Sequence, residues 1–278
     1  GSEMCIRDRL RKTGKISDLK LDDLEELFGT RPERIGGEQK AGSAIFIDFR
    51  LLLFPVESAK GCFAYVTSPL CLSRLCRDLK TAGLENLMNV PLIEGVASIA
   101  MQQLDGNKCL IPPNSPIMLK DRRVVLANGA MVLEAEENND VGQLADQFSE
   151  KIVPDMPGYK SYFKHIIKNH LTIISDDNLK VLVRRAMDVR VRIRLNYEKK
   201  VVVTGGLFTT ENIPENTVFY SYILIPARGL EKSKVSKITD LLDKIFDPAK
   251  KEGRLLIFGG DETVGRGLCR LLTLKAQS

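Results

Sequence analysis

The stretch Val189–Leu195 reads VRVRIRL and alternates without exception between apolar residues and arginines. Because successive side chains of a β-strand point to opposite faces, this period predicts a strand with one apolar face and one arginine face. A strand rises about 3.3 Å per residue, so its arginines stand roughly 6.6 Å apart. That spacing is close to one phosphate per arginine on an extended single strand of nucleic acid.

The residues that follow predict a hairpin. NYEKK at positions 196–200 is typical of a turn, and VVVTGGLF at positions 201–208 predicts a returning strand. The candidate nucleic-acid contacts here are Arg190, Arg192, Arg194, Lys199 and Lys200. The alternative is an exposed strand whose charges prevent edge-to-edge aggregation, although lysine is the usual residue for that purpose.

The positive charge of the chain is concentrated around this hairpin. The net charge is +5, and the window 184–200 holds seven basic and two acidic residues, which also gives +5. The other 34 basic and 34 acidic residues cancel. The whole excess therefore lies in one short segment, which indicates a local binding surface for a polyanion.

Strands and helices alternate irregularly along the rest of the chain. Strands are predicted at 44–56, 61–69, 171–174, 217–227, 254–258 and 268–274, and helices at 21–29, 70–83, 141–152, 159–169, 175–187 and 236–246. The segment 89–139 is mixed, and we expect β-ribbons or irregular insertions there. This order favours an α+β fold with antiparallel sheets.

Composition excludes several classes of protein. The 278 residues fit one large domain or two small ones, and no apolar stretch approaches the roughly eighteen residues that span a bilayer. The six cysteines form no CxxC pair and are expected to be reduced cytoplasmic thiols. His165 and His170 are five residues apart, which misses the usual zinc spacing. No metal-ligating set is therefore assigned.

A second unusual stretch, LLIFGGDETVGRGLCRLL at positions 255–272, contains four glycines. Gly260 and Gly265 have P-loop spacing, but Arg266 and Gly267 stand where Lys and Ser or Thr are needed. A dinucleotide-binding fingerprint also fails, because its third glycine is missing.

The remaining interpretation is a tight strand–loop–strand turn whose backbone N–H groups can hold phosphate oxygens. A plain structural turn is the open alternative. The candidate RNA-binding residues of this loop are Gly259, Gly260, Thr263, Gly265, Arg266 and Gly267.

Several segments together resemble one family. GGDETVGRGL at positions 259–268 resembles the glycine-rich signature of RAMP proteins, the RNA-binding subunits of CRISPR effector complexes. The segments 51–79 and 192–224, and the short helix LEELFG at 24–29, are similar to the backbone subunit of the type III-B (Cmr) complex. They follow the family's order over nearly the whole chain.

The resemblance implies an RNA-recognition-motif-like (ferredoxin-like) antiparallel sheet with helices, insertions and a protruding hairpin, the thumb, at 189–222. It implies cytoplasmic guide-RNA and target-RNA binding, contacts with other RAMP subunits, self-association along the guide and no membrane contact. Residues 1–9, GSEMCIRDR, resemble a cloning scar followed by sequencing read-through. We therefore expect residues 10–278 to form a single RAMP domain that lacks its first strand.

The family cleaves target RNA with Mg²⁺ or another divalent metal, through an aspartate in an N-terminal loop that this sequence lacks. The thumb also departs from the family pattern, since Thr210, Glu211 and Asn212 precede Ile213 and Pro214 and keep one carboxylate. We therefore assign no catalytic residue and no cofactor to this chain, and expect weak RNA binding without cleavage. The alternative hypothesis is a nucleotide-processing enzyme that uses the glycine-rich loop.

Overall fold

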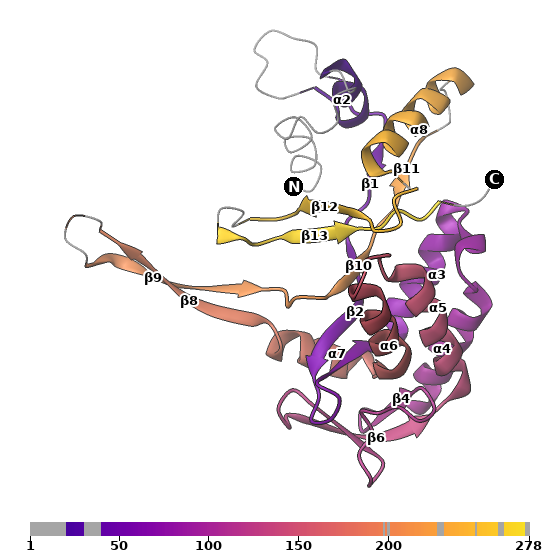
Figure 1. Ribbon diagram of the computed structural model, residues 1–278, viewed down its shortest axis with the longest axis vertical. Coiled ribbons are helices and arrows are strands. Elements are labelled where there is room, and N and C mark those ends of the chain that lie inside the picture. Colours follow the sequence, from indigo (N-terminus) through magenta and orange to yellow (C-terminus); the bar gives the residue numbers. More distant parts are fainter. Residues whose placement is uncertain are drawn as a thin grey trace.

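The computed structural model describes residues 21–30, 40–196, 198, 201–226, 231–247, 249–260 and 264–275. Figure 1 shows a large lower body of helices packed on a sheet and a smaller upper part. A long hairpin of β8 (Asp188–Leu195) and β9 (Val202–Asn212) projects from the body. A shorter ribbon of β12 (Arg254–Ile257) and β13 (Leu268–Leu271) projects toward the same side.

The body is built on a seven-stranded sheet. Its strands are β2 (Arg50–Glu57), β3 (Phe63–Thr67), β4 (Lys108–Ile111), β5 (Arg123–Leu126), β6 (Met131–Glu137), β7 (Leu171–Ile173) and β10 (Val218–Tyr220). They lie in the order β10-β2-β3-β7-β4-β6-β5. Strands far apart in sequence are therefore neighbours, so no local segment could form this sheet alone.

The expectation of an antiparallel sheet is wrong in two places. The pairs β3–β7 and β4–β6 are parallel, whereas the other neighbouring strands are antiparallel. Parallel strands need a connection of about a dozen residues or more, which usually contains other elements. Here the connection from β3 to β7 includes helices, and the one from β4 to β6 includes β5, so both crossovers have the length they need.

Four helices cover one face of the sheet: α3 (Pro69–Ala82), α4 (Val90–Gln103), α5 (Asn139–Ile152) and α6 (Tyr159–His170). Leu53, Tyr65 and Leu110 point from the strands into this layer and are fully buried. On the opposite face, Phe54 and Val66 lie in a second buried cluster. The middle of the sheet is therefore closed to large ligands on both faces.

The second face packs against α7 (Asp176–Arg185) through Leu179 and Leu182, and β5 and β6 contribute Val124 and Leu133 to the same cluster. Ser175 caps α7 by accepting a hydrogen bond from the backbone N–H of Asn178, as serine commonly does at a helix start. Since α7 ends at Arg185 and β8 begins at Asp188, the second core layer sets the point from which the hairpin leaves the body.

The helix α4 was not expected, because the segment 89–139 was predicted to be β-ribbon or irregular. Asn89 caps the helix by accepting from the N–H of Leu92, and Pro91 lies in its first turn. Both features favour a helix start. The pattern was weak because an apolar residue, Met101, also lies on the exposed side of the helix, outside the buried stripe of Val90, Ile93, Val96, Ala97 and Ala100.

The upper part has its own small core. It contains α2 (Leu21–Phe28), α8 (Lys232–Phe246) and the short pair β1 (Ile45–Phe46) and β11 (Ile223–Leu224). Phe28 and Phe46 stack with their ring centroids 5.0 Å apart. The helices expected at 21–29 and 236–246 are thus confirmed, and each buries its apolar face against the other.

Two segments connect the upper part with the body. The strand expected at 44–56 is divided into β1 and β2, and the strand expected at 217–227 is divided into β10 and β11. The two segments run antiparallel, and the Ile47 N–H donates to the Tyr222 carbonyl across 3.2 Å. Each segment contributes one strand to the body sheet and another to the short pair in the upper part, so neither segment is a single strand.

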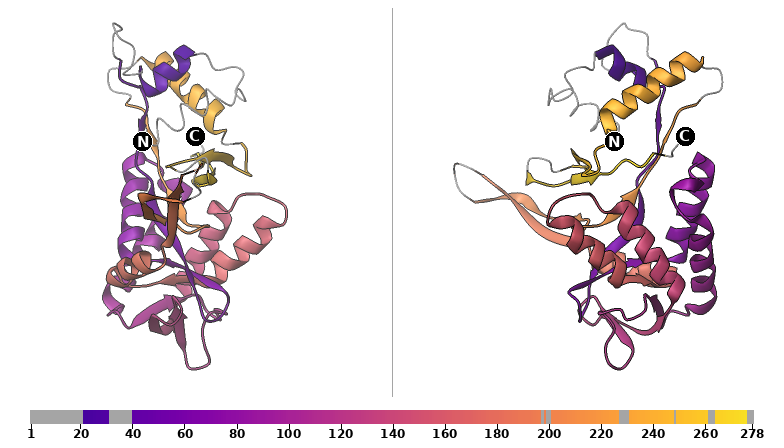
Figure 2. Two further views of the ribbon diagram at one scale, coloured as in Figure 1. Left: turned by 90° about the vertical axis from the view of Figure 1, so that its left-hand side faces the viewer. Right: turned by 45° about the vertical axis from the view of Figure 1, so that its right-hand side comes forward.

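The hairpin is shorter than the range 189–222 predicted for it. β9 ends at Asn212, and β10 leaves the hairpin to pair with β2 at the edge of the body sheet. The right-hand view of Figure 2 shows the hairpin projecting well beyond the helices, and in the left-hand view it points toward the viewer. Its strands therefore leave the body core and present both faces outside it.

Candidate nucleic-acid interface

The register of the hairpin places a defined set of side chains on its arginine face. Cross-strand partners share a face, so Arg190 lies beside Thr210 and Arg192 beside Phe208. Gly206 lies against Arg194, where any side chain at position 206 would meet the arginine backbone and Cβ. We define the arginine face as Asp188, Arg190, Arg192 and Arg194 on β8 with Gly206, Phe208, Thr210 and Asn212 on β9.

Asp188 joins the hairpin to the glycine-rich ribbon. Arg190 Nε donates to Asp188 Oδ1 and Oδ2 at 3.1 and 2.9 Å, and Arg266 Nη1 reaches Oδ2 at 3.2 Å. The side chains remain 62% exposed for Arg190 and 29% exposed for Arg266. The hydrogen bond from Arg190, with that from Arg266, holds the pKa of Asp188 below its ordinary value. Two guanidinium groups from separate ribbons thus converge on one ionised carboxylate.

Farther out on the arginine face, an aromatic ring accompanies the cations. The guanidinium carbon of Arg192 lies 5.8 Å from the centroid of the Phe208 ring, and Phe208 is 45% exposed. Arg194 is exposed. Proteins that bind single-stranded nucleic acid stack bases on exposed aromatic rings and contact phosphates with neighbouring cationic side chains.

The opposite face of the hairpin is apolar and open to solvent. Val189, Val191, Ile193 and Leu207 are 56%, 67%, 53% and 65% exposed. We call these four side chains the apolar face. Glu211 pairs with Val189 and therefore lies on this side, away from the arginines.

The glycine-rich segment is a strand–loop–strand turn. It joins the antiparallel strands β12 and β13, whereas a P-loop leads from a strand into a helix. Gly267 has φ +72°, and a Cβ there would collide with the carbonyl oxygen of Phe258, whose N–H donates to the Gly267 carbonyl at 2.8 Å. Gly259 and Gly265 also have positive φ, while Gly260 does not. Gly267 is thus required by the turn itself.

Three residues proposed from the sequence, Lys199, Lys200 and Thr263, lie outside the described residues, as does the segment 1–9. The structure brings Arg190 and Arg266 to a single carboxylate and places Arg192 and Arg194 farther along the same hairpin face. The glycines of the loop lie on the adjacent ribbon.

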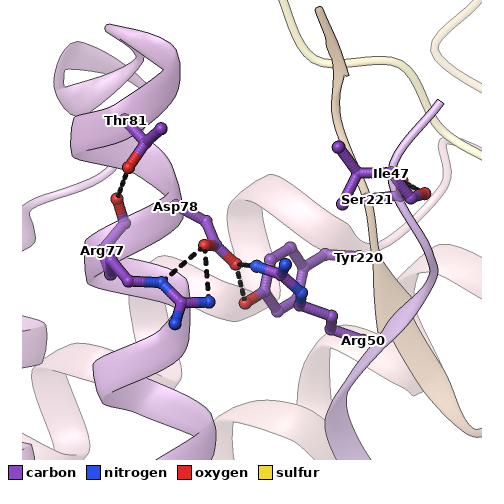
Figure 3. Close-up of polar contacts among 7 residues, drawn as sticks. All are labelled: Ile47, Arg50, Arg77, Asp78, Thr81, Tyr220 and Ser221. Atoms are coloured by element: carbon purple, nitrogen blue, oxygen red, sulfur yellow. Dashed lines mark hydrogen bonds and ion pairs between the residues drawn. The ribbon is translucent and has the colours of Figure 1, made fainter. Parts of the chain in front are cut away.

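A buried polar network holds the segment that follows the hairpin (Figure 3). Asp78 on α3 is only 3% exposed and pairs with Arg50 on β2 and Arg77 on α3. The Tyr220 hydroxyl on β10 donates to Asp78 Oδ2 at 2.7 Å. Although burial favours the neutral acid, the hydrogen bonds from Arg50, Tyr220 and Arg77 outweigh it and lower the pKa of Asp78. The network therefore clamps β10 to the body.

Sequence reasoning missed Asp188, Phe208 and the Asp78 network. A signal for Phe208 existed, because Phe208, Thr210 and Asn212 are two residues apart and so share one face of the returning strand. Assigning these residues to the arginine face required the strand register, which shifts between Ile193 and Leu195. Asp78 carries no local pattern, since its partners Arg50 and Tyr220 are 28 and 142 residues away.

Within the described residues, no group of three or more His, Cys, Asp or Glu side chains could hold a metal ion. None of the described helices combines the length and apolar character needed to cross a bilayer.

Comparisons with known proteins identify relatives. No family model matches the chain. The Cmr endoribonuclease Cmr4 of Pyrococcus furiosus is 32% identical over 271 residues, which cover 97% of this chain and 80% of the relative. The crystal structure of oligomeric Cmr4 from that organism has a TM-score of 0.65 at 24% identity and covers 96% of this chain and 82% of its own.

A chain of the type III-B Cmr-beta complex, solved by cryo-electron microscopy with cognate target RNA, matches with a TM-score of 0.65. It is 21% identical, and the match covers 96% of this chain and 80% of that one. The chain thus shares the overall fold of oligomeric Cmr4 and of this chain of the Cmr-beta complex. At 32% identity over nearly its whole length, the chain belongs to the Cmr4 family.

Proposed function

We propose that this protein is the guide-RNA-binding backbone subunit of a type III-B CRISPR effector complex, and that it holds RNA between the arginine face and the glycine-rich ribbon. The observation that carries this proposal is the meeting of Arg190 and Arg266 at Asp188. It brings together arginines of two elements that are 76 residues apart in the chain.

The chemistry of the surface supports RNA in an extended form. Arginines on alternate strand positions stand roughly 6.6 Å apart and can each contact one phosphate without reading sequence. Phe208 offers a ring on which an unpaired base can stack. Because both faces of the body sheet are buried, the hairpin and ribbon are the better place for a polyanion.

We further propose that the hairpin is the thumb of this family and that the body sheet is a rearranged RNA-recognition-motif sheet. The helix layer on one face supports the second assignment. Self-association along the guide is proposed from the oligomeric relative, with the apolar face as the candidate contact surface. Target RNA and other RAMP subunits are also proposed partners, because a similar chain belongs to a Cmr-beta complex bound to cognate target RNA.

The relative is named an endoribonuclease, and metal-dependent cleavage is part of the family proposal. The described residues do not fit a divalent-metal site, because they offer no cluster of three or more acidic, histidine or cysteine ligands. No cleavage step is derived from them.

The test is RNA binding by a variant with Arg190, Arg192 and Arg194 changed to alanine. Fluorescence anisotropy with a labelled polyuridylate is measured across a range of salt concentrations. Losing three phosphate contacts should weaken binding and reduce the slope of log K against log salt by about 2. The matched control changes Lys120, Arg123 and Lys151, three exposed basic residues of the body, to alanine.

An unchanged affinity and salt slope in the hairpin variant would contradict the proposal. Titration with free ATP and GTP separates the alternative, because a nucleotide-processing enzyme should bind them and a guide-RNA subunit should not. Saturable nucleotide binding that depends on Arg266 would favour the enzyme.

A further inference from the structure

The pairing at the base of the hairpin has features of an anion site filled by the protein itself. Arg190 and Arg266 approach Asp188 from separate ribbons, and all three side chains are at least 29% exposed. Arg190 reaches the carboxylate through Nε and Arg266 through Nη1, and each guanidinium has several N–H donors. A site with this geometry can accept another oxyanion in place of the carboxylate.

We infer that Arg190 and Arg266 form a phosphodiester-binding site whose place is held by the Asp188 carboxylate until an RNA phosphate displaces it. The inference rests on the proposed function and assigns Asp188 a role within it. Both anions present oxygen acceptors that suit arginine, so the exchange keeps both guanidinium groups paired.

The exchange is feasible because the ion pairs are exposed. Pairs of this kind are worth little in water and are weakened by salt, so a phosphate does not have to overcome a deeply buried contact. The neighbouring cations also favour RNA over an isolated anion. Arg192 and Arg194 follow on the same face, and an RNA strand that reached them would bring a phosphate to the position of Asp188.

Asp188 also weakens the attraction of the free protein for other polyanions. It lowers the positive charge of a surface that would otherwise attract any polyanion. Asp188 is held opposite Asn212 on β9, because the Asn212 side-chain amide donates to the main-chain carbonyl of Asp188 at 3.1 Å. The carboxylate therefore stays at the base of the ladder in the free protein.

The experiment compares Asp188→Asn with the wild-type chain, using labelled polyuridylate at low and near-physiological salt. Removing the competing charge should tighten binding roughly two- to tenfold. Asp121→Asn is the matched control, because Asp121 also pairs with an arginine two residues later, and both side chains are exposed. Thermal melting of each variant checks that folding is retained.

A double-mutant cycle tests the site itself. The gain from Asp188→Asn should be clearly smaller when Arg266 is also changed to alanine, because only Arg190 is then released. Unchanged or weaker binding by Asp188→Asn overturns the inference, as does an equal gain in the Asp121→Asn control or a gain that Arg266→Ala does not reduce. If Asp188→Asn has no effect but the triple arginine variant binds weakly, this inference fails while the proposed function stands.

Discussion

Replacing Asp78 with alanine should lower the free energy of unfolding by about 3 kcal/mol. Asp78 is 3% exposed and accepts from Arg50, Arg77 and Tyr220. Arg77 is 60% exposed and can be solvated when the carboxylate is gone, so its loss costs little. The cost comes from the Tyr220 hydroxyl, which loses a charged acceptor, and from Arg50, which is 29% exposed and loses its counter-ion.

The assay is urea unfolding together with thermal melting. For a chain of this size, about 3 kcal/mol corresponds to a fall of roughly 5–10 °C in Tm. Asp121→Ala is the control, since that exposed carboxylate also pairs with an arginine and should change stability by less than about 0.5 kcal/mol. Equal effects of the two substitutions would refute the reasoning that burial makes the Asp78 network important.

Two other outcomes follow from the structure. Gly267→Ala should destabilise the protein by about 2 kcal/mol and weaken RNA binding, because φ is +72° and a Cβ would meet the Phe258 carbonyl. Gly260 has no positive φ and open space around it, so Gly260→Ala should change stability by less than about 0.5 kcal/mol in the same thermal melts. The lowered pKa of Asp78 means that its charge stabilises the fold above the unfolded-state value of about 4, and that this contribution is lost as pH falls toward the folded-state pKa. The difference in unfolding free energy between the wild type and Asp78→Asn should therefore shrink between about pH 5 and pH 3, and a difference that stays constant would contradict the assignment.

Local patterns were sufficient where neighbouring residues determine the structure. The alternation of VRVRIRL predicts β8, and Ser175 before Asp176 predicts the start of α7. The helices α3, α5 and α6 are also found within one or two residues of their predicted bounds. In each case the period of apolar residues or a capping side chain carries the information over a few residues.

Patterns were insufficient where the partner is distant. The sheet is mixed because β3 pairs with β7, although more than a hundred residues separate them. The helix α4 buries Val90, Ile93, Val96, Ala97 and Ala100 against other core elements, but the apolar Met101 on its exposed side hides this stripe in the sequence. A period of two likewise assigns Phe208 to one face of its strand, but not to the face that carries the arginines.

The amino-acid sequence by itself determined that the chain has an arginine-faced hairpin, a glycine turn between two strands and a family resemblance, because each is encoded in contiguous residues. Only the tertiary structure decided that Arg266 meets Arg190 at Asp188 and that Asp78 clamps β10. Those contacts join residues up to 142 positions apart, and their geometry depends on how the sheets pack. The sequence determines the chemistry of each side chain, but the whole fold determines how far apart two side chains lie.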